Sequence, residues 1–184
     1  MRAGLPLIIL LLVLVIGLSA CTFRKGERHR SFKSIVNAPF TSNRDQESDL
    51  LEELISCIES QDKRALTKYF APRIAASDNF DQQCSDLFDF YTGTMESYEW
   101  QAASAHEVAS LRNYKETKVS YDIFTTETTY RLSVLYCNKD DEDDRNIGIL
   151  SLYIIHFEDT DPQYSYWGDG NWTPGINVMT EPQA

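Results

Sequence analysis

The first half of the chain carries apolar residues at the spacing of amphipathic helices. They recur every three or four positions in three segments, which end near Ser60, Pro72 and Gly93. The first segment places Leu50, Leu51, Leu54, Ile55 and Ile58 on one stripe, and the third places Phe80, Cys84, Leu87, Phe88 and Tyr91 on another. This period predicts three helices. Asp49 followed by Glu52 predicts a capping box at the start of the first.

Asp62 is predicted to cap the second helix, and Pro72 to close it. Beyond Gly93 the period falls to two. Apolar or aromatic residues alternate with polar ones in the segments 98–108, 119–123 and 130–136, as in half-buried strands. Residues 149–157 are apolar at both parities, which is typical of a strand covered on both faces. Helices followed by strands predict an α+β fold, with the helices on one side of an antiparallel sheet.

The N-terminal sequence predicts where the protein is located. Arg2 is followed by an apolar run from Leu5 to Ile16, which is shorter than the roughly 20 residues of a membrane-spanning helix. A positive start, a short apolar core and small residues before a cut describe a secretory signal. "LSAC", which ends at Cys21, resembles the lipobox of bacterial lipoproteins, in which the cysteine receives a diacylglycerol and becomes the first mature residue.

The predicted organisation is a signal peptide at 1–20, a basic tether at 21–44 and one domain at 45–180. Two or more acyl chains make a stable anchor, so a diacylated Cys21 would hold the protein by palmitate-type chains on the outer face of the cell membrane. Basic tether residues would add attraction to anionic headgroups, unless the tether is only a solvated linker. The formal net charge of −11 leaves no basic surface for nucleic acid.

A family resemblance covers about residues 50–178. The segments "LFDFYTGTMESYEW" and "YWGDGNWTPGINV" are its most distinctive pieces, and they resemble the bacterial lipoproteins of domain-of-unknown-function family 5104. That family is similar to the nuclear-transport-factor-like, cystatin-like superfamily. The resemblance implies N-terminal helices packed in the concave face of a curved antiparallel sheet, which forms a cone open at one end. It implies no activity.

Two histidines are candidates for catalysis in such a cone. His156 shares strand parity with Leu152 and Ile154, and His106 shares it with Trp100, so both could face the interior. The alternative in each case is a structural histidine, whose ring forms hydrogen bonds with the backbone or with water. An isomerase or dehydratase would need a titratable group of this kind inside the cavity.

Aromatic residues are candidates for ligand binding. They are Tyr98, Trp100, Tyr166, Trp167 and Trp172, and the last three lie in a turn-rich segment. Amphipathic rings at a pocket mouth suit the recognition of sugars, peptides or a partner surface. The competing interpretation, which we favour for the turn-rich segment, is that its rings close the open end of the cone.

The remaining groups suggest no cofactor. Cys57, Cys84 and Cys137 form no metal motif, and a bridge between Cys57 and Cys84 stays open beside the favoured interpretation of buried free thiols. The acidic loop "DDEDDRN", residues 140–146, lacks the spacing of an EF-hand, and we expect repulsion without order there rather than a metal site.

The sequence therefore predicts a lipid-anchored extracytoplasmic protein that works by binding. Its partner would be a small molecule, a cell-wall fragment or another protein, and a homodimer through the open sheet face is a third prospect. The alternative is a small cone-fold enzyme that uses His156 or His106.

Overall fold

The structure, a computed structural model, describes residues 43–108, 114–160 and 170–180. The helices are α3 (Asn43–Glu59), α4 (Lys63–Thr67), α5 (Pro72–Ala75) and α6 (Phe80–Phe90). The strands are β1 (Met95–Val108), β2 (Tyr114–Thr125), β3 (Thr129–Lys139), β4 (Gly148–His156) and β5 (Gly175–Met179), and the short 3-10 helices are η1 (Asp144–Asn146) and η2 (Phe157–Asp159). The α+β class is confirmed. Among the described residues no helix is long and apolar enough to cross a membrane.

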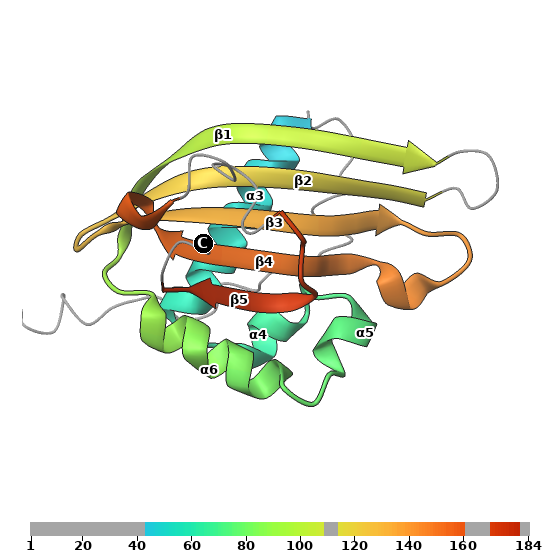
Figure 1. The fold of residues 1–184 in the computed structure, drawn as a ribbon, viewed down its shortest axis with the longest axis horizontal. Coiled ribbons are helices and arrows are strands. Elements are labelled where there is room, and N and C mark those ends of the chain that lie inside the picture. The colour runs from blue at the N-terminus through green and yellow to red at the C-terminus, as the bar shows by residue number, and fades with distance from the viewer. Residues whose placement is uncertain (1–42, 109–113, 161–169, 181–184) are drawn as a thin grey trace, which may run out of the picture.

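The strands form one open sheet in the order β1-β2-β3-β4-β5 (Figure 1). The first three pairings are antiparallel, but β4 and β5 pair in parallel. The prediction of an antiparallel sheet is therefore wrong at this edge, and the sheet is mixed. The cause is β5, a strand of five residues that follows a turn-rich segment and gave no alternating pattern long enough to predict.

Helix α3 crosses one face of the sheet, which we call the helix face (Figure 1). Its predicted apolar stripe is confirmed, since its five members are at most 2% exposed: Leu50, Leu51, Leu54, Ile55 and Ile58. The helix begins at Asn43, so the predicted capping box at Asp49 is wrong. The other helices lie along the β5 edge, where the side-chain oxygen Oε1 of Gln83 in α6 accepts a hydrogen bond of 3.1 Å from the backbone of Ile176.

The predicted turns fall where the polar residues indicate. Asp62 caps α4 through a 2.8 Å bond from the backbone of Ala65. Pro72 does not merely close α4, because it is the first residue of α5, where its missing N–H costs nothing. The turn between β2 and β3 closes with a 2.9 Å bond from Thr125 N to the carbonyl of Thr128.

Two segments share one edge of β4. Residues 151–155 pair with β5, while Ile149 forms a parallel bridge with Phe70. The bridge consists of bonds from Ile149 N to Tyr69 O, 2.8 Å, and from Ala71 N to Ile149 O, 3.0 Å. Gly148 makes this approach feasible, because a Cβ there would lie 2.5 Å from Ala71 N.

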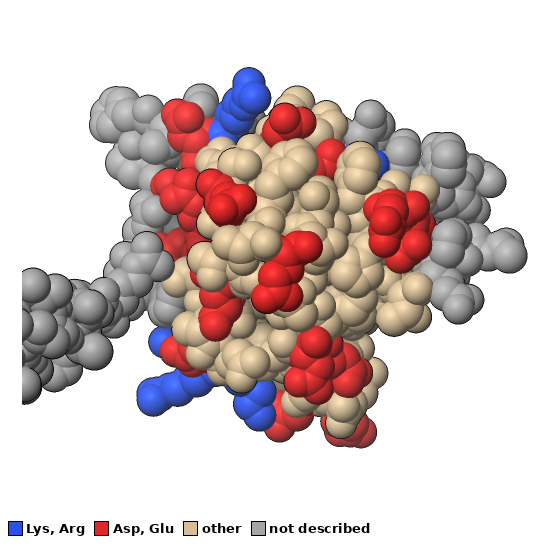
Figure 2. Space-filling model, turned by 90° about the vertical axis from the view of Figure 1, so that its left-hand side faces the viewer, with Lys and Arg blue, Asp and Glu red and all other residues tan. Residues whose placement is uncertain are grey.

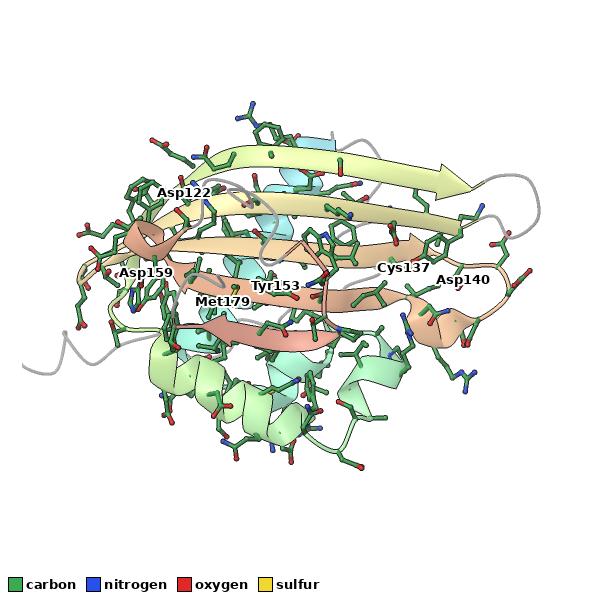
Figure 3. The ribbon with its side chains drawn as sticks, viewed as in Figure 1. Asp122, Cys137, Asp140, Tyr153, Asp159 and Met179 are labelled. Atoms are coloured by element: carbon green, nitrogen blue, oxygen red, sulfur yellow. The ribbon has the colours of Figure 1, made fainter. Side chains whose placement is uncertain are left out.

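The opposite face of the sheet, the outer face, carries buried polar groups. Arg131 donates from Nε and Nη2 to the two carboxylate oxygens of Asp122 at 2.7 and 2.9 Å. The Phe157 ring lies 5.1 Å from that guanidinium. Figure 3 shows Asp122 toward the end of the sheet that carries Asp159, and Tyr153 nearer its middle.

The surface reflects the net charge. Figure 2 shows the end of the molecule at the left of Figure 1, and acidic side chains outnumber basic ones on it. A surface with this excess of negative charge repels a second anionic surface.

Candidate functional site

A pocket of about 300 Å³ lies between the first turn of α3 and the helix face of β1, β2 and β3. Four elements of the chain contribute to it from widely separated positions. Its lining consists of Arg44, Gln46, Glu47, Trp100, Ala103, Ser104, Lys115, Thr117, Tyr136 and Asn138. The volume is at the lower end of the range for small-molecule sites.

A β-bulge sets which residues of β1 reach this pocket. The register shifts between Trp100 and Ala102, so that Trp100 pairs with Tyr121 and Ala103 with Val119. Ala103 therefore lines the pocket in the place that simple alternation gives to Ala102.

Glu47 is the most buried charged group of the pocket, at 5% exposure. Trp100 Nε1 donates to its Oε2 at 3.1 Å. Burial raises the pKa of Glu47 above its ordinary value of 4.5, while the Trp100 hydrogen bond and the nearby Arg44 lower this pKa in part. The Arg44 guanidinium lies 5.2 Å from the centre of the Trp100 ring. At the side of the pocket, the Arg44 guanidinium thus lies over the Trp100 ring, and the N–H of that ring donates to the Glu47 carboxylate.

Two buried polar atoms have no hydrogen-bond partner among the described residues. They are Oδ1 of Asn138, which lines the pocket, and the hydroxyl of Tyr121, a residue 1% exposed that pairs with Trp100 but is not part of the lining. Burial raises the pKa of Tyr121, and the charge of nearby Glu47 raises it further. Because buried polar groups in folded proteins are nearly always paired, the amide oxygen of Asn138 is a candidate contact for a ligand group in the pocket.

The structure separates the aromatic candidates. Tyr98 and Trp100 both lie on the helix face, but only Trp100 lines the pocket, since Tyr98 packs on Tyr121 and donates to Glu52 at 3.2 Å. Trp172 lies over the outer face, with its ring 5.9 Å from that of Tyr153 and 5.0 Å from Lys118 Nζ. Tyr166, Trp167 and the lipid candidate Cys21 lie outside the described residues.

The two histidine candidates do not meet at the pocket. His156 is half-buried on the helix face, with ring centres 4.7 Å from Phe90 and 5.0 Å from Tyr130, and it is not part of the pocket lining. The backbone of His106 pairs with Glu116 beyond the bulge, so the unbroken alternation from Trp100 on which its prediction depended does not hold. Its side chain is outside the described part of the structure.

The acidic loop is ordered by its own hydrogen bonds, contrary to the expectation of repulsion without order. Asp140 is buried and accepts from the backbones of Glu142 and Asp143 and from the Asn146 amide, the last at 2.7 Å. Asp143 pairs with Arg145 at 2.9 Å. Figure 3 shows Asp140 at the end of the sheet away from Asp122. No group of three His, Cys, Asp or Glu among the described residues is placed to hold a metal ion.

Cys57, Cys84 and Cys137 are buried thiols that form no disulfide with one another. Burial raises the pKa of Cys57 to about 12 and that of Cys84 to about 11. Thiols of this kind are structural rather than reactive, because the thiolate is the nucleophilic form.

Sequence reasoning missed Glu47, Lys115, Tyr136 and Asn138. A signal for the first was available, because Glu47 stands three residues before Leu50 and so continues the apolar stripe of α3. A carboxylate on such a stripe indicates a buried polar role. The other three lie on strands with no distinguishing pattern.

A family model described as "Domain of unknown function (DUF5104)" matches residues 53–157. The chain belongs to this family. The matched segment contains all the pocket residues contributed by the strands, whereas Arg44, Gln46 and Glu47 precede it. A comparison with curated proteins finds no match.

Proposed function

We propose that the protein is a lipoprotein, anchored by Cys21 to the outer face of the cell membrane, whose folded domain binds a ligand in the Trp100 pocket. The observation that carries the binding role is the pocket itself, which joins an aromatic wall to Glu47 and to the unpaired Oδ1 of Asn138. A small number of polar groups on an aromatic wall is the usual make-up of a small-molecule site.

The proposed fold family is the nuclear-transport-factor-like cone. The position of α3 across one face of an open five-stranded sheet supports this assignment (Figure 1). A binding pocket between the helix and the sheet would then be the cavity of the cone. The fold itself names no ligand, since one fold hosts many functions.

The alternative of an isomerase or dehydratase that uses a cavity histidine has less support. Such an enzyme would need its base in the cavity, and His156 stacks instead on Tyr130 outside the pocket lining. A non-enzymatic binding module is therefore the function we put forward.

The anchor is tested by Cys21→Ala in a bacterial host fed radioactive palmitate. We expect the wild type to be labelled and cut before Cys21, and the variant to stay uncut and unlabelled. A wild-type mature N-terminus at any other residue, without fatty chains, would contradict the anchor.

The pocket is tested with the full chain in detergent and Trp100 as its only tryptophan, through Trp167→Phe and Trp172→Phe. Alanine, alanyl-alanine, the dimer of N-acetylglucosamine and inorganic phosphate serve as probes, and Trp100 emission reports on binding. We expect at least one probe to shift the emission. Ala103→Phe should abolish that shift, because it fills the pocket, and Ala76→Phe, at an exposed site directly after α5, should preserve it. Failure of all four probes, or equal effects of the two variants, would refute this binding role.

A further inference from the structure

The charged groups of the pocket differ in depth. Glu47 is buried, whereas Arg44 is exposed and Lys115 is half-buried. The pocket lining therefore holds a carboxylate on its inner side and two cations nearer to solvent. This arrangement is asymmetric, and it suits a ligand that carries both signs of charge at different ends.

Two polar atoms on the pocket residues are hydrogen-bond acceptors without a donor among the described residues, and the nearby Tyr121 hydroxyl, also without a partner among them, can donate or accept. Trp100 occupies Oε2 of Glu47, and its Oε1 receives no donor from the described residues. Oδ1 of Asn138 is likewise without a donor among them. A carboxylate oxygen and an amide oxygen together call for a ligand group rich in N–H donors, and an ammonium has three.

We infer that the pocket binds a zwitterion with a primary ammonium and a carboxylate, that is, an amino acid or a short peptide with free ends. The ammonium would donate to Glu47 Oε1 and Asn138 Oδ1, and the carboxylate would meet Arg44 and Lys115. The side chain of the ligand would pack on Trp100 and Tyr136. This inference rests on the proposed binding function, which it makes specific.

Other ligand classes satisfy the pocket less completely. A simple anion would pair with the two cations but would lie beside the buried Glu47 carboxylate, which repels it. A diamine would pair with Glu47 and be repelled by Arg44 and Lys115. A neutral sugar would bond to the acceptors and bring no counter-charge to either end of the pocket. A zwitterion brings one to both ends.

The inference is tested by calorimetric titration of the full chain in detergent with alanyl-alanine and two blocked forms of it. We expect N-acetyl-alanyl-alanine, which lacks the ammonium, and alanyl-alanine amide, which lacks the carboxylate, to bind about tenfold more weakly or worse. Titration with alanine itself distinguishes a free amino acid from a peptide as the preferred form.

Two variants assign the ends of the ligand. Glu47→Gln should remove the preference over the N-acetylated form and keep that over the amide, and Lys115→Gln should do the reverse. The matched controls are Glu52→Gln, an exposed carboxylate of α3, and Lys118→Gln, which lies over Trp172 on the outer face. Both controls should bind as the wild type does.

The outcomes separate the two proposals. Binding of the sugar dimer or phosphate in an Ala103-sensitive manner, with no binding of alanine or alanyl-alanine, would overturn the zwitterion and keep the pocket as a binding site. Equal affinity for alanyl-alanine and both blocked forms would also overturn it. Absence of binding by every probe would overturn both.

Discussion

Two buried carboxylates on opposite faces of the sheet have different surroundings. Asp122, on the outer face, is 4% exposed and receives two hydrogen bonds from the guanidinium of Arg131. Glu47, on the helix face, is 5% exposed and receives one from a neutral indole. Burial alone therefore does not distinguish them.

The number of partners distinguishes a structural group from a candidate site. The charge of Asp122 is neutralised by Arg131 within the fold, so a structural role accounts for it. Glu47 has a second carboxylate oxygen with no donor in the described part of the chain, and burial holds the pKa of Glu47 above its ordinary value. A carboxylate held in this way is costly to the fold, which is the usual condition of a group kept for function.

The largest effect is expected from Arg131→Met. It would leave Asp122 buried without a counter-charge, which typically costs about 3–5 kcal/mol of unfolding free energy. Urea unfolding followed by circular dichroism measures the loss. The double variant Asp122→Leu with Arg131→Met should recover most of it. A single variant as stable as the wild type would show that the pair is not required by the fold.

The matched control for this pair is Arg145→Ala. Arg145 makes the same kind of bidentate contact with Asp143, but in an exposed loop. We expect no measurable change in unfolding there, because solvent screens surface ion pairs.

An intermediate effect is expected from Trp100→Phe. This change removes the donor that Glu47 has among the described residues, and an unsatisfied buried acceptor costs about 1–3 kcal/mol. Tyr98→Phe is the control on the same strand, since it removes a bond to the exposed Glu52, and about 0.5 kcal/mol is expected. Equal losses in the two variants would contradict a special role for the Glu47 contact.

The smallest effect is expected in the pH dependence of the unfolding free energy of Glu47→Gln, and its sign is fixed by the raised pKa of Glu47. Because the folded-state pKa of Glu47 is raised, the wild type is most stable while this group is protonated and loses stability as the pH rises from 4.5 through the folded-state pKa. Arg44, Tyr121 and Tyr136 are the ionisable groups that interact with it. The Gln variant is expected to gain on the wild type across that window.

Urea unfolding of both chains from about pH 4 to about pH 8 measures this difference. Glu127→Gln, at an exposed position in the β2–β3 turn, is the control and should follow the wild type throughout. A difference that shrinks as the pH rises would reverse the sign and refute the assignment.

The sequence predicts the elements well where a single period decides them. The stripe of α3, the Asp62 cap and the buried strand β4 are confirmed, because each depends on residues close in the chain. The first turn of α3 was not predictable from helix signals alone. Its polar residues are helical in a context where Glu47 contacts Trp100, fifty-three positions later.

The errors in the candidate site have one physical origin. Alternation assigns faces only while the register is unbroken, and the bulge after Trp100 shifts the pairing register of the rest of β1. The pocket also combines α3 with three strands, so its membership depends on packing that no local pattern encodes. Strand β5, the parallel partner of β4, was not predicted for a similar reason, because the segment that connects the two strands carries no periodic signal.

The bridge between Phe70 and Ile149 has a consequence for the order in which the chain acquires its structure. The segment from α4 to α6 leaves the ribosome long before β4 exists to receive it, and β5, its other support, is later still. A growing chain that stops before Gly148 can form its local helical turns but has no edge on which to dock them. Docking of this early segment therefore waits for nearly the whole polypeptide, and such non-local closure slows folding.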